Sequence, residues 1–253
     1  MKQKACILLI IVLSIVTSSF SQVSVRDSAI STAIIYGTYS YEFPGGDLAK
    51  RFGAVSAIGG GFMVKTKSNW LFSVEGKYLF GGDVKNRDSL LKGISTPDGF
   101  VIDVNGYYAD IYYYERGFSF YGKFGKIINI LAPNPNCGFT IMAGAGFLQD
   151  KIRISNPGNS APQVFGDYKK GYDRLNNGFS VNVSLGYLFL SNSRLLNFWG
   201  GFEFTQAWTA GRRNRDFDTG KKDTKKYSSQ WYGLKVCWMI PLYKRSPNPY
   251  YMY

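Results

Sequence analysis

Five charged residues lie in segments that are otherwise built of apolar and small residues. They are Glu75, Lys77, Lys123, Glu203 and Lys235. Charged side chains that share the small-residue face of a strand could line a narrow conduit for ions or water, or could neutralise one another in a packed interior. A lone charge in a closed interior is costly, and pairing is the usual remedy. We therefore expect an interior polar network and keep the conduit as the functional alternative.

The residues that most hydrolytic sites need are missing. The chain contains no histidine, and hydrolysis of the Ser-His-Asp type requires an imidazole as base. Histidine is also the commonest ligand of transition metals. We predict a protein that is not an enzyme and has no catalytic residue, no metal site and no cofactor. Acidic residues of one long connection lack the spacing of a calcium-binding loop; they are Asp83, Asp88, Asp98, Asp103, Asp110 and Glu115.

A second charged group lies in the segment 212–227. Its seven basic residues outnumber Asp216, Asp218 and Asp223, which gives 7 − 3 = +4. Arginine in particular suits bidentate contact with phosphate. We expect these side chains either to contact lipopolysaccharide phosphates or to form a solvated basic loop, and weigh the two equally. The seven are Arg212, Arg213, Arg215, Lys221, Lys222, Lys225 and Lys226.

Period-two alternation predicts the elements that carry these side chains. In 179–189, apolar residues occupy every second position, and small or polar residues such as Ser180, Asn182 and Ser184 stand between them. Such a pattern is typical of strands that have one apolar face. The other predicted strands are 70–80 and 232–242, the less regular 118–124, 139–147 and 198–208, and the glycine-containing 31–41 and 54–66.

The connections between these strands alternate in length. Long gaps at 42–53, 81–116, 156–176 and 212–227 are interleaved with short gaps at 67–69, 132–136 and 191–196. Outer-membrane barrels have long outer loops and short periplasmic turns. The sequence therefore predicts an all-β fold: an eight-stranded antiparallel transmembrane up-and-down β-barrel with short periplasmic turns and long extracellular loops. A soluble barrel is disfavoured, because it needs its polar face outward.

Aromatic residues add two expectations about the barrel surface. Those near strand ends are predicted to form interfacial girdles. The tyrosine-rich run 107–114 predicts either a strand that continues above the membrane or an aromatic docking face for a protein partner. The predicted girdle residues are Tyr36, Tyr41, Trp70, Trp208, Tyr232 and Tyr243.

The start of the chain has the pattern of an export signal. Lys2 and Lys4 precede an apolar stretch that ends in small residues, which predicts a signal peptide at 1–21. The barrel domain is then expected at 22–243 and a periplasmic C-terminal tail at 244–253. Loss of the two lysines lowers the formal charge to 13 − 2 = +11. Cys137 and Cys237 are predicted to be free thiols, because they lie on strands that are not neighbours.

The export signal, the eight strands and the stretch Gly233-x-x-Val236-x-Trp238 together resemble small outer-membrane barrels of the OmpA/OmpX type of Gram-negative bacteria. The resemblance covers about residues 30 to 243. It implies an integral protein of the cell outer membrane that barrel-assembly machinery recognises through its last strand, and it implies no shared function.

The predicted role is a non-enzymatic one, structural or in interactions, such as membrane stabilisation, lipopolysaccharide contact or service as an accessory subunit of an envelope or secretion machine. A narrow porin-like channel is the alternative. The expected partners are outer-membrane lipid, lipopolysaccharide, the assembly machinery and, as a further candidate, an envelope protein complex. An exported protein is not expected to meet nucleic acid.

Overall fold

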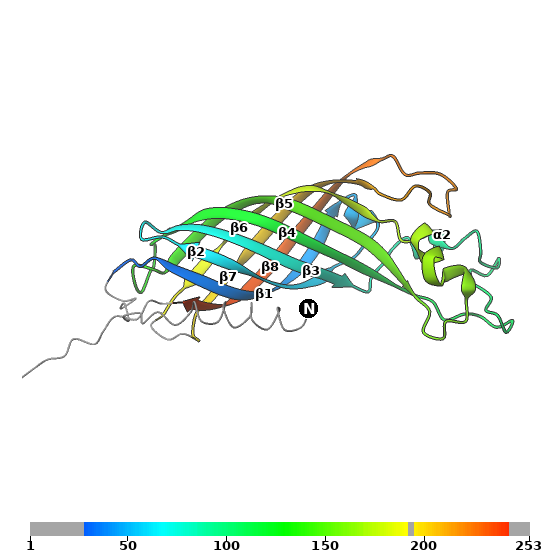
Figure 1. Cartoon of the computed structure of the whole chain (residues 1–253), viewed down its shortest axis with the longest axis horizontal. Coiled ribbons are helices and arrows are strands. Elements are labelled where there is room, and N and C mark those ends of the chain that lie inside the picture. The colour runs from blue at the N-terminus through cyan, green and yellow to red at the C-terminus, as the bar shows by residue number, and fades with distance from the viewer. Residues whose placement is uncertain (1–27, 192–194, 243–253) are drawn as a thin grey trace, which may run out of the picture.

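The chain folds into one closed barrel of eight antiparallel strands (Figure 1). The computed structural model describes residues 28–191 and 195–242, so the predicted signal peptide and C-terminal tail lie outside the described residues. The strands are β1 (Thr32–Gly46), β2 (Val55–Lys65), β3 (Trp70–Gly81), β4 (Tyr112–Ile128), β5 (Gly138–Ser155), β6 (Asn176–Phe189), β7 (Phe198–Gly211) and β8 (Lys226–Leu242). Short helices lie between them: η1 (Leu48–Lys50), α2 (Arg87–Leu90), η2 (Pro162–Val164) and η3 (Gly166–Gly171).

Each strand pairs with its sequence neighbours, and the first strand pairs with the last. The ladder between β1 and β8 runs from Ala33 opposite Leu242 to Gly46 opposite Ser229. A closed ring satisfies the backbone N–H and C=O groups of its strands internally, as hydrocarbon surroundings require. The predicted eight-stranded antiparallel barrel is confirmed. Within the described residues, no helix has the length and apolarity needed to cross a membrane.

The connections emerge at two opposite ends of the barrel. The short-turn end carries 66–69, 129–137 and 190–197, and the long-loop end carries 47–54, 82–111, 156–175 and 212–225. The first long connection differs from its prediction, since 47–54 is no longer than 129–137. The reason is that β1 continues to Gly46 along an equally extended β8. The large connections gather beyond one end of the barrel, around α2 (Figure 1).

Two neighbouring strands are much longer than a membrane crossing requires. β4 has 17 residues and β5 has 18, whereas a tilted transmembrane strand needs about 9–11. Their paired ends, Tyr112 opposite Ser155 and Tyr114 opposite Arg153, extend the sheet at the long-loop end. The strand prediction for the tyrosine-rich run is therefore correct from Tyr112 onward, whereas 107–111 belongs to the connection.

The outer face of the ring is apolar along the length of the strands. Tyr41, Trp70, Trp208 and Tyr232 are exposed on it, as predicted for girdle residues. Tyr36 is a correction, because its side chain shares the inward face of β1 and is only 4% exposed. The sixth predicted girdle residue, Tyr243, lies outside the described residues. Other outward side chains include Phe72, Val74, Phe120, Phe124, Leu185, Phe202, Leu234 and Val236.

An arginine in the middle of this outer face should destabilise the barrel. Leu185 is exposed on β6 between Phe179 and Phe189, and Leu185→Arg should lower the free energy of unfolding in phospholipid vesicles by about 2–4 kcal/mol. Urea titration measures this. Phe100→Arg, at an exposed loop position, is the control and should change stability by less than about 0.5 kcal/mol. Equal effects of the two substitutions would contradict a lipid-facing role for Leu185.

Candidate functional site

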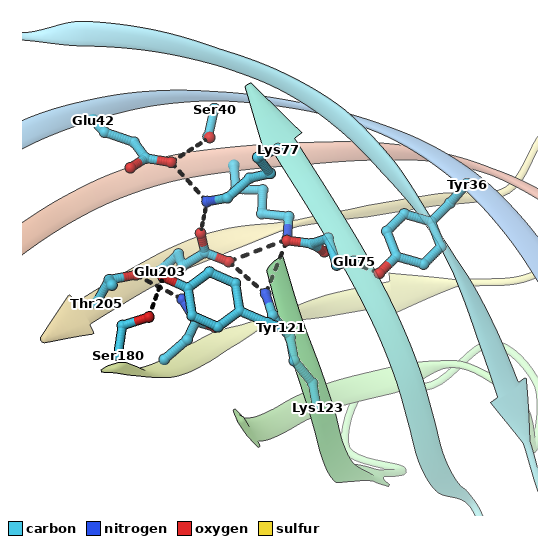
Figure 2. A network of polar contacts seen from close by, with 12 residues as sticks. Tyr36, Ser40, Glu42, Glu75, Lys77, Tyr121, Lys123, Ser180, Glu203 and Thr205 are labelled. Atoms are coloured by element: carbon cyan, nitrogen blue, oxygen red, sulfur yellow. Dashed lines mark hydrogen bonds and ion pairs between the residues drawn. The ribbon is translucent and has the colours of Figure 1, made fainter. Parts of the chain in front are cut away.

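The middle of the barrel interior holds three lysines and three glutamates, which we call the central network. They come from five strands, β1, β3, β4, β7 and β8, and each residue is at most 5% exposed. Because each of the six alternates with outward apolar residues, its side chain points into the barrel. There the six side chains meet at one level. Figure 2 shows the carboxylates and ammonium groups pointing toward one another. The six are Glu42, Glu75, Lys77, Lys123, Glu203 and Lys235.

Glu203 is the centre of the central network, because it accepts hydrogen bonds from all three lysines. Its Oε2 lies 2.9 Å from Lys123 Nζ and 3.1 Å from Lys235 Nζ, and its Oε1 accepts from Lys77. Glu75 binds two of the lysines, at 2.9 Å from Lys123 and 2.6 Å from Lys235. The formal charges cancel, 3 − 3 = 0. Such mutual pairing is what makes buried charges tolerable.

The sixth member, Glu42, is absent from the residues that the sequence analysis predicts. Its Oε1 accepts hydrogen bonds from Lys77 Nζ at 2.7 Å and from Ser40 Oγ at 2.7 Å. The predicted strand ends at residue 41, which assigns Glu42 to a loop. The signal is nevertheless present in the sequence, since Thr38, Ser40 and Glu42 alternate with outward aromatic residues. The structure brings the five predicted residues together. Glu42 adds the negative charge that balances the three lysines.

Neutral groups and glycines complete the central network. Tyr36 donates its hydroxyl to Glu75 Oε2 at 2.9 Å. Inward glycines leave room for these large side chains. A Cβ at Gly61 would lie 2.5 Å from Tyr36 Oη, and one at Gly144 would lie 2.6 Å from Lys123 Cγ. The inward surfaces of β2 and β5 are therefore flat where neighbouring strands contribute long side chains.

Apolar side chains fill the lumen toward the short-turn end. A buried cluster there includes Ile34, Met63, Leu71 and Trp199. Below it, Lys65 is completely buried, and its Nζ donates to Asn136 Oδ1 at 2.8 Å and to the Ile30 carbonyl at 3.1 Å. The segment before β1 is thereby fixed across the end of the barrel.

The long-loop end is filled in a different way, because the loops themselves supply apolar side chains. Leu48 and Phe52 come from the first connection, Leu90 from α2 and Val164 from η2, and they pack with Trp231 of β8. A polar group lies near this second cluster. Arg51 Nη1 donates to the buried Asp150 Oδ2 at 2.9 Å.

Glu115 is a further correction to the sequence analysis. It is predicted among the acidic residues of the second long loop, whereas it lies on β4 and is completely buried. Neither of its carboxylate oxygens has a hydrogen-bond partner among the residues described. The alternation of β4 extends further toward the N-terminus than the sequence analysis assigns, and this turns Glu115 inward. No three His, Cys, Asp or Glu side chains of the described ranges are grouped to hold a metal ion.

The distribution of side chains is thus inverted relative to a soluble barrel. The exposed face is apolar, and the interior is charged at its centre and filled on both sides of that centre. The chain is a small closed β-barrel of eight strands, which is the architecture that the resemblance to OmpA/OmpX-type barrels implies. Cys137 and Cys237 are buried free thiols.

Several solved structures of bacterial proteins resemble this barrel. The attachment invasion locus protein Ail of Yersinia pestis aligns with a TM-score of 0.44 and 10% identity, over 83% of this chain and 99% of that chain. Neisserial surface protein A aligns with a TM-score of 0.40 and 9% identity, over 82% and 96%. The outer membrane protein OprG of Pseudomonas aeruginosa aligns with a TM-score of 0.38 and 10% identity, over 86% and 99%. No protein-family model matches the chain, and no curated protein sequence matches it.

The seven basic residues predicted for the fourth long loop have different surroundings in the structure, and Lys226 is the first residue of β8 rather than part of the connection. Arg213 forms a bidentate pair with Asp173, with Nε 2.8 Å from Oδ1, and this hydrogen bonding raises the pKa of Arg213. Arg212 donates to Asn177, and Lys225 lies 3.9 Å from Asp47. The remaining four are exposed and have no ion pair within the described residues; they are Arg215, Lys221, Lys222 and Lys226.

Neutralising Glu203 should destabilise the barrel strongly. Glu203→Gln keeps the size of the side chain but leaves three buried lysines with two carboxylates, and loss of a buried partner costs about 3–5 kcal/mol. Denaturant unfolding in phospholipid vesicles measures the change. Asp98→Asn, a matched substitution at an exposed loop position, should leave the free energy of unfolding unchanged. A loss below about 1 kcal/mol for Glu203→Gln would contradict a stabilising role of the pairing.

Proposed function

We propose that this chain is an integral outer-membrane protein without enzymatic activity, whose barrel is a closed scaffold for an interaction surface at the long-loop end. The observation that carries the proposal is the charge-balanced central network. Its lysines and glutamates bind one another across the lumen at 2.6–3.1 Å. Eight-stranded barrels have interiors just wide enough for side chains to fill. A packed interior favours a scaffold over a conduit.

The orientation follows from the same proposal. We infer that the long-loop end faces the exterior and the short-turn end the periplasm, in line with the usual arrangement of such barrels. Recognition of β8 by the assembly machinery belongs to the same proposal.

The interaction surface has two kinds of side chain that support contact with other molecules. Lys221 and Lys222 are exposed and form no ion pair in the described part of the chain, which suits phosphate groups of lipopolysaccharide. Phe100, Tyr107 and Tyr108 are exposed in the second long connection, and aromatic residues of this kind favour a protein partner. An accessory role in an envelope complex would use this second region.

The closed-scaffold proposal predicts a barrel that does not conduct. Purified native protein, taken from outer membranes after mild crosslinking, should give no reproducible conductance in planar bilayers, because ion pairs and apolar clusters occupy the lumen. Mass spectrometry of the same sample identifies proteins that co-purify. A stoichiometric partner without conductance would support the accessory role. Reproducible conductance without a partner would overturn the proposal and make the central network a pore lining.

If the long-loop end binds lipopolysaccharide phosphates, removing positive charge there should weaken lipopolysaccharide binding, whereas removing it at the short-turn end should not. Replacing both Lys221 and Lys222 by Gln should weaken binding of lipopolysaccharide to the purified barrel severalfold at low salt, and less at high salt because salt screens exposed charges. Replacing Lys67 and Lys126 by Gln removes the same charge at exposed positions near the short-turn end. That control should bind normally. Equal weakening in both variants would show a nonspecific effect of net charge.

A further inference from the structure

A crevice at the long-loop end is formed by segments that are distant in the sequence. The first connection with η1, the helix α2, the ends of β5 and β6, and the start of β8 all contribute to it. It encloses a cavity of about 190 Å³. The lining residues are Asp47, Lys50, Arg51, Asn86, Ser89, Leu90, Ile152, Arg174, Asn176, Asp223, Lys225 and Tyr227.

The basic side chains of the crevice are all paired with acids. Lys50 Nζ lies 3.2 Å and Lys225 Nζ 3.9 Å from Asp47. A hydrogen bond from the Ser228 backbone N–H lowers the pKa of Asp47, which keeps this carboxylate ionised. Arg51 is held by Asp150 at 2.9 Å.

The fourth basic residue, Arg174, is paired as well. It contacts Asp218, and its Nε lies 3.9 Å from Asp216. With Asp223 included, the crevice and its immediate partners carry four cations and five carboxylates, 4 − 5 = −1. This balance does not favour an anion, in contrast to the exposed lysines of the fourth connection.

The groups left for a ligand are amides and a hydroxyl. Asn176 is only 3% exposed as a residue, and its side chain lines the cavity. Asn86 lines it from an exposed position, and Ser89 makes a local bond to the Asn86 carbonyl, at 2.9 Å. These groups can both donate and accept hydrogen bonds.

The walls of the crevice are held in place by their own contacts. Arg51 bridges Asp150 and the Arg174 carbonyl, which Nη2 reaches at 3.0 Å. Arg174 adopts a positive φ of 46°, a conformation rare for a residue with a side chain. The Tyr227 hydroxyl donates to Asp223 at 2.6 Å, which fixes its ring beside the cavity. A site with fixed walls loses little conformational entropy when a ligand binds.

We propose that this crevice binds one residue of an uncharged sugar at the cell surface. A sugar ring carries several hydroxyl groups that each donate and accept, which matches the paired charges and the amides of the lining, and its apolar face can rest on the partly exposed Tyr227. The cavity is smaller than the roughly 300–1,000 Å³ of drug-sized sites, which suits a single ring. The sugar could belong to lipopolysaccharide of the same membrane or to a foreign glycan. The proposal does not depend on the phosphate contacts.

Ligand-observed NMR on the full-length barrel tests this, in phosphocholine micelles because maltoside and glucoside detergents would compete. The probes are methyl glycosides of glucose, galactose, mannose and N-acetylglucosamine, with inorganic phosphate alongside. We expect saturable binding of at least one glycoside. Asn176→Ala should weaken it about three- to tenfold, the effect of one lost hydrogen bond. Ser89→Trp, at an exposed position of α2, should abolish it by filling the crevice.

Controls separate loss of the site from loss of the fold. Lys222→Ala, at an exposed position outside the crevice, should bind the glycoside as the parent protein does, and all variants should keep the heat-modifiable gel migration of a folded barrel. Oligosaccharides released from lipopolysaccharide and from other glycans then identify the source of the sugar. Absence of saturable binding by every glycoside, unchanged binding in Ser89→Trp, or tighter binding of phosphate than of any glycoside would each overturn the proposal.

Discussion

The requirement that every backbone polar group find a partner inside the ring governs this structure. Hydrocarbon supplies no hydrogen bonds, so an open sheet edge cannot face lipid. The ladder between β1 and β8 removes that edge from Ala33 to Gly46. Once the ring is closed, each of the eight strands has one face toward lipid and the other toward a narrow interior. The remaining features follow from how that interior is filled.

The interior is filled in layers of different chemistry. Glu203 and its partners occupy the centre, where three ammonium groups and three carboxylates satisfy one another. The layers on either side are apolar, and the one at the long-loop end is completed by Phe52 and Leu90 from the connections. The loops are therefore anchored to the barrel by their own core. This anchoring allows side chains from distant segments to share a crevice with fixed walls.

Much of this architecture could be predicted from period-two alternation, because lipid and lumen impose opposite preferences on successive residues. The five predicted network residues of β3, β4, β7 and β8 lie within segments that the alternation predicts as strands, although it is less regular around Lys123 and Glu203. The predictions for Glu42 and Tyr36 are wrong because the predicted first strand stops at residue 41 and the inward face of β1, which alternates with outward aromatic residues from Tyr36 to Glu42, is not recognised. The prediction for Glu115 is wrong because strands can extend beyond the membrane, where the apolar signal fades. The crevice could not be predicted, since it depends on how Asn176 and the distant connections meet in space.

The hydrogen bonds that hold the segment before β1 to Asn136 affect the order of folding. Ile30 N–H donates to Asn136 Oδ1 at 2.9 Å across a sequence separation of 106 residues, and Asn136 Nδ2 donates to the Ser28 carbonyl at 2.9 Å. Contacts of such long range form late, because a large loop must close before they contribute. The first four strands must therefore be in place before the leading segment is locked. Asn136 therefore binds the segment before β1 only after the first four strands, half of the barrel, have formed.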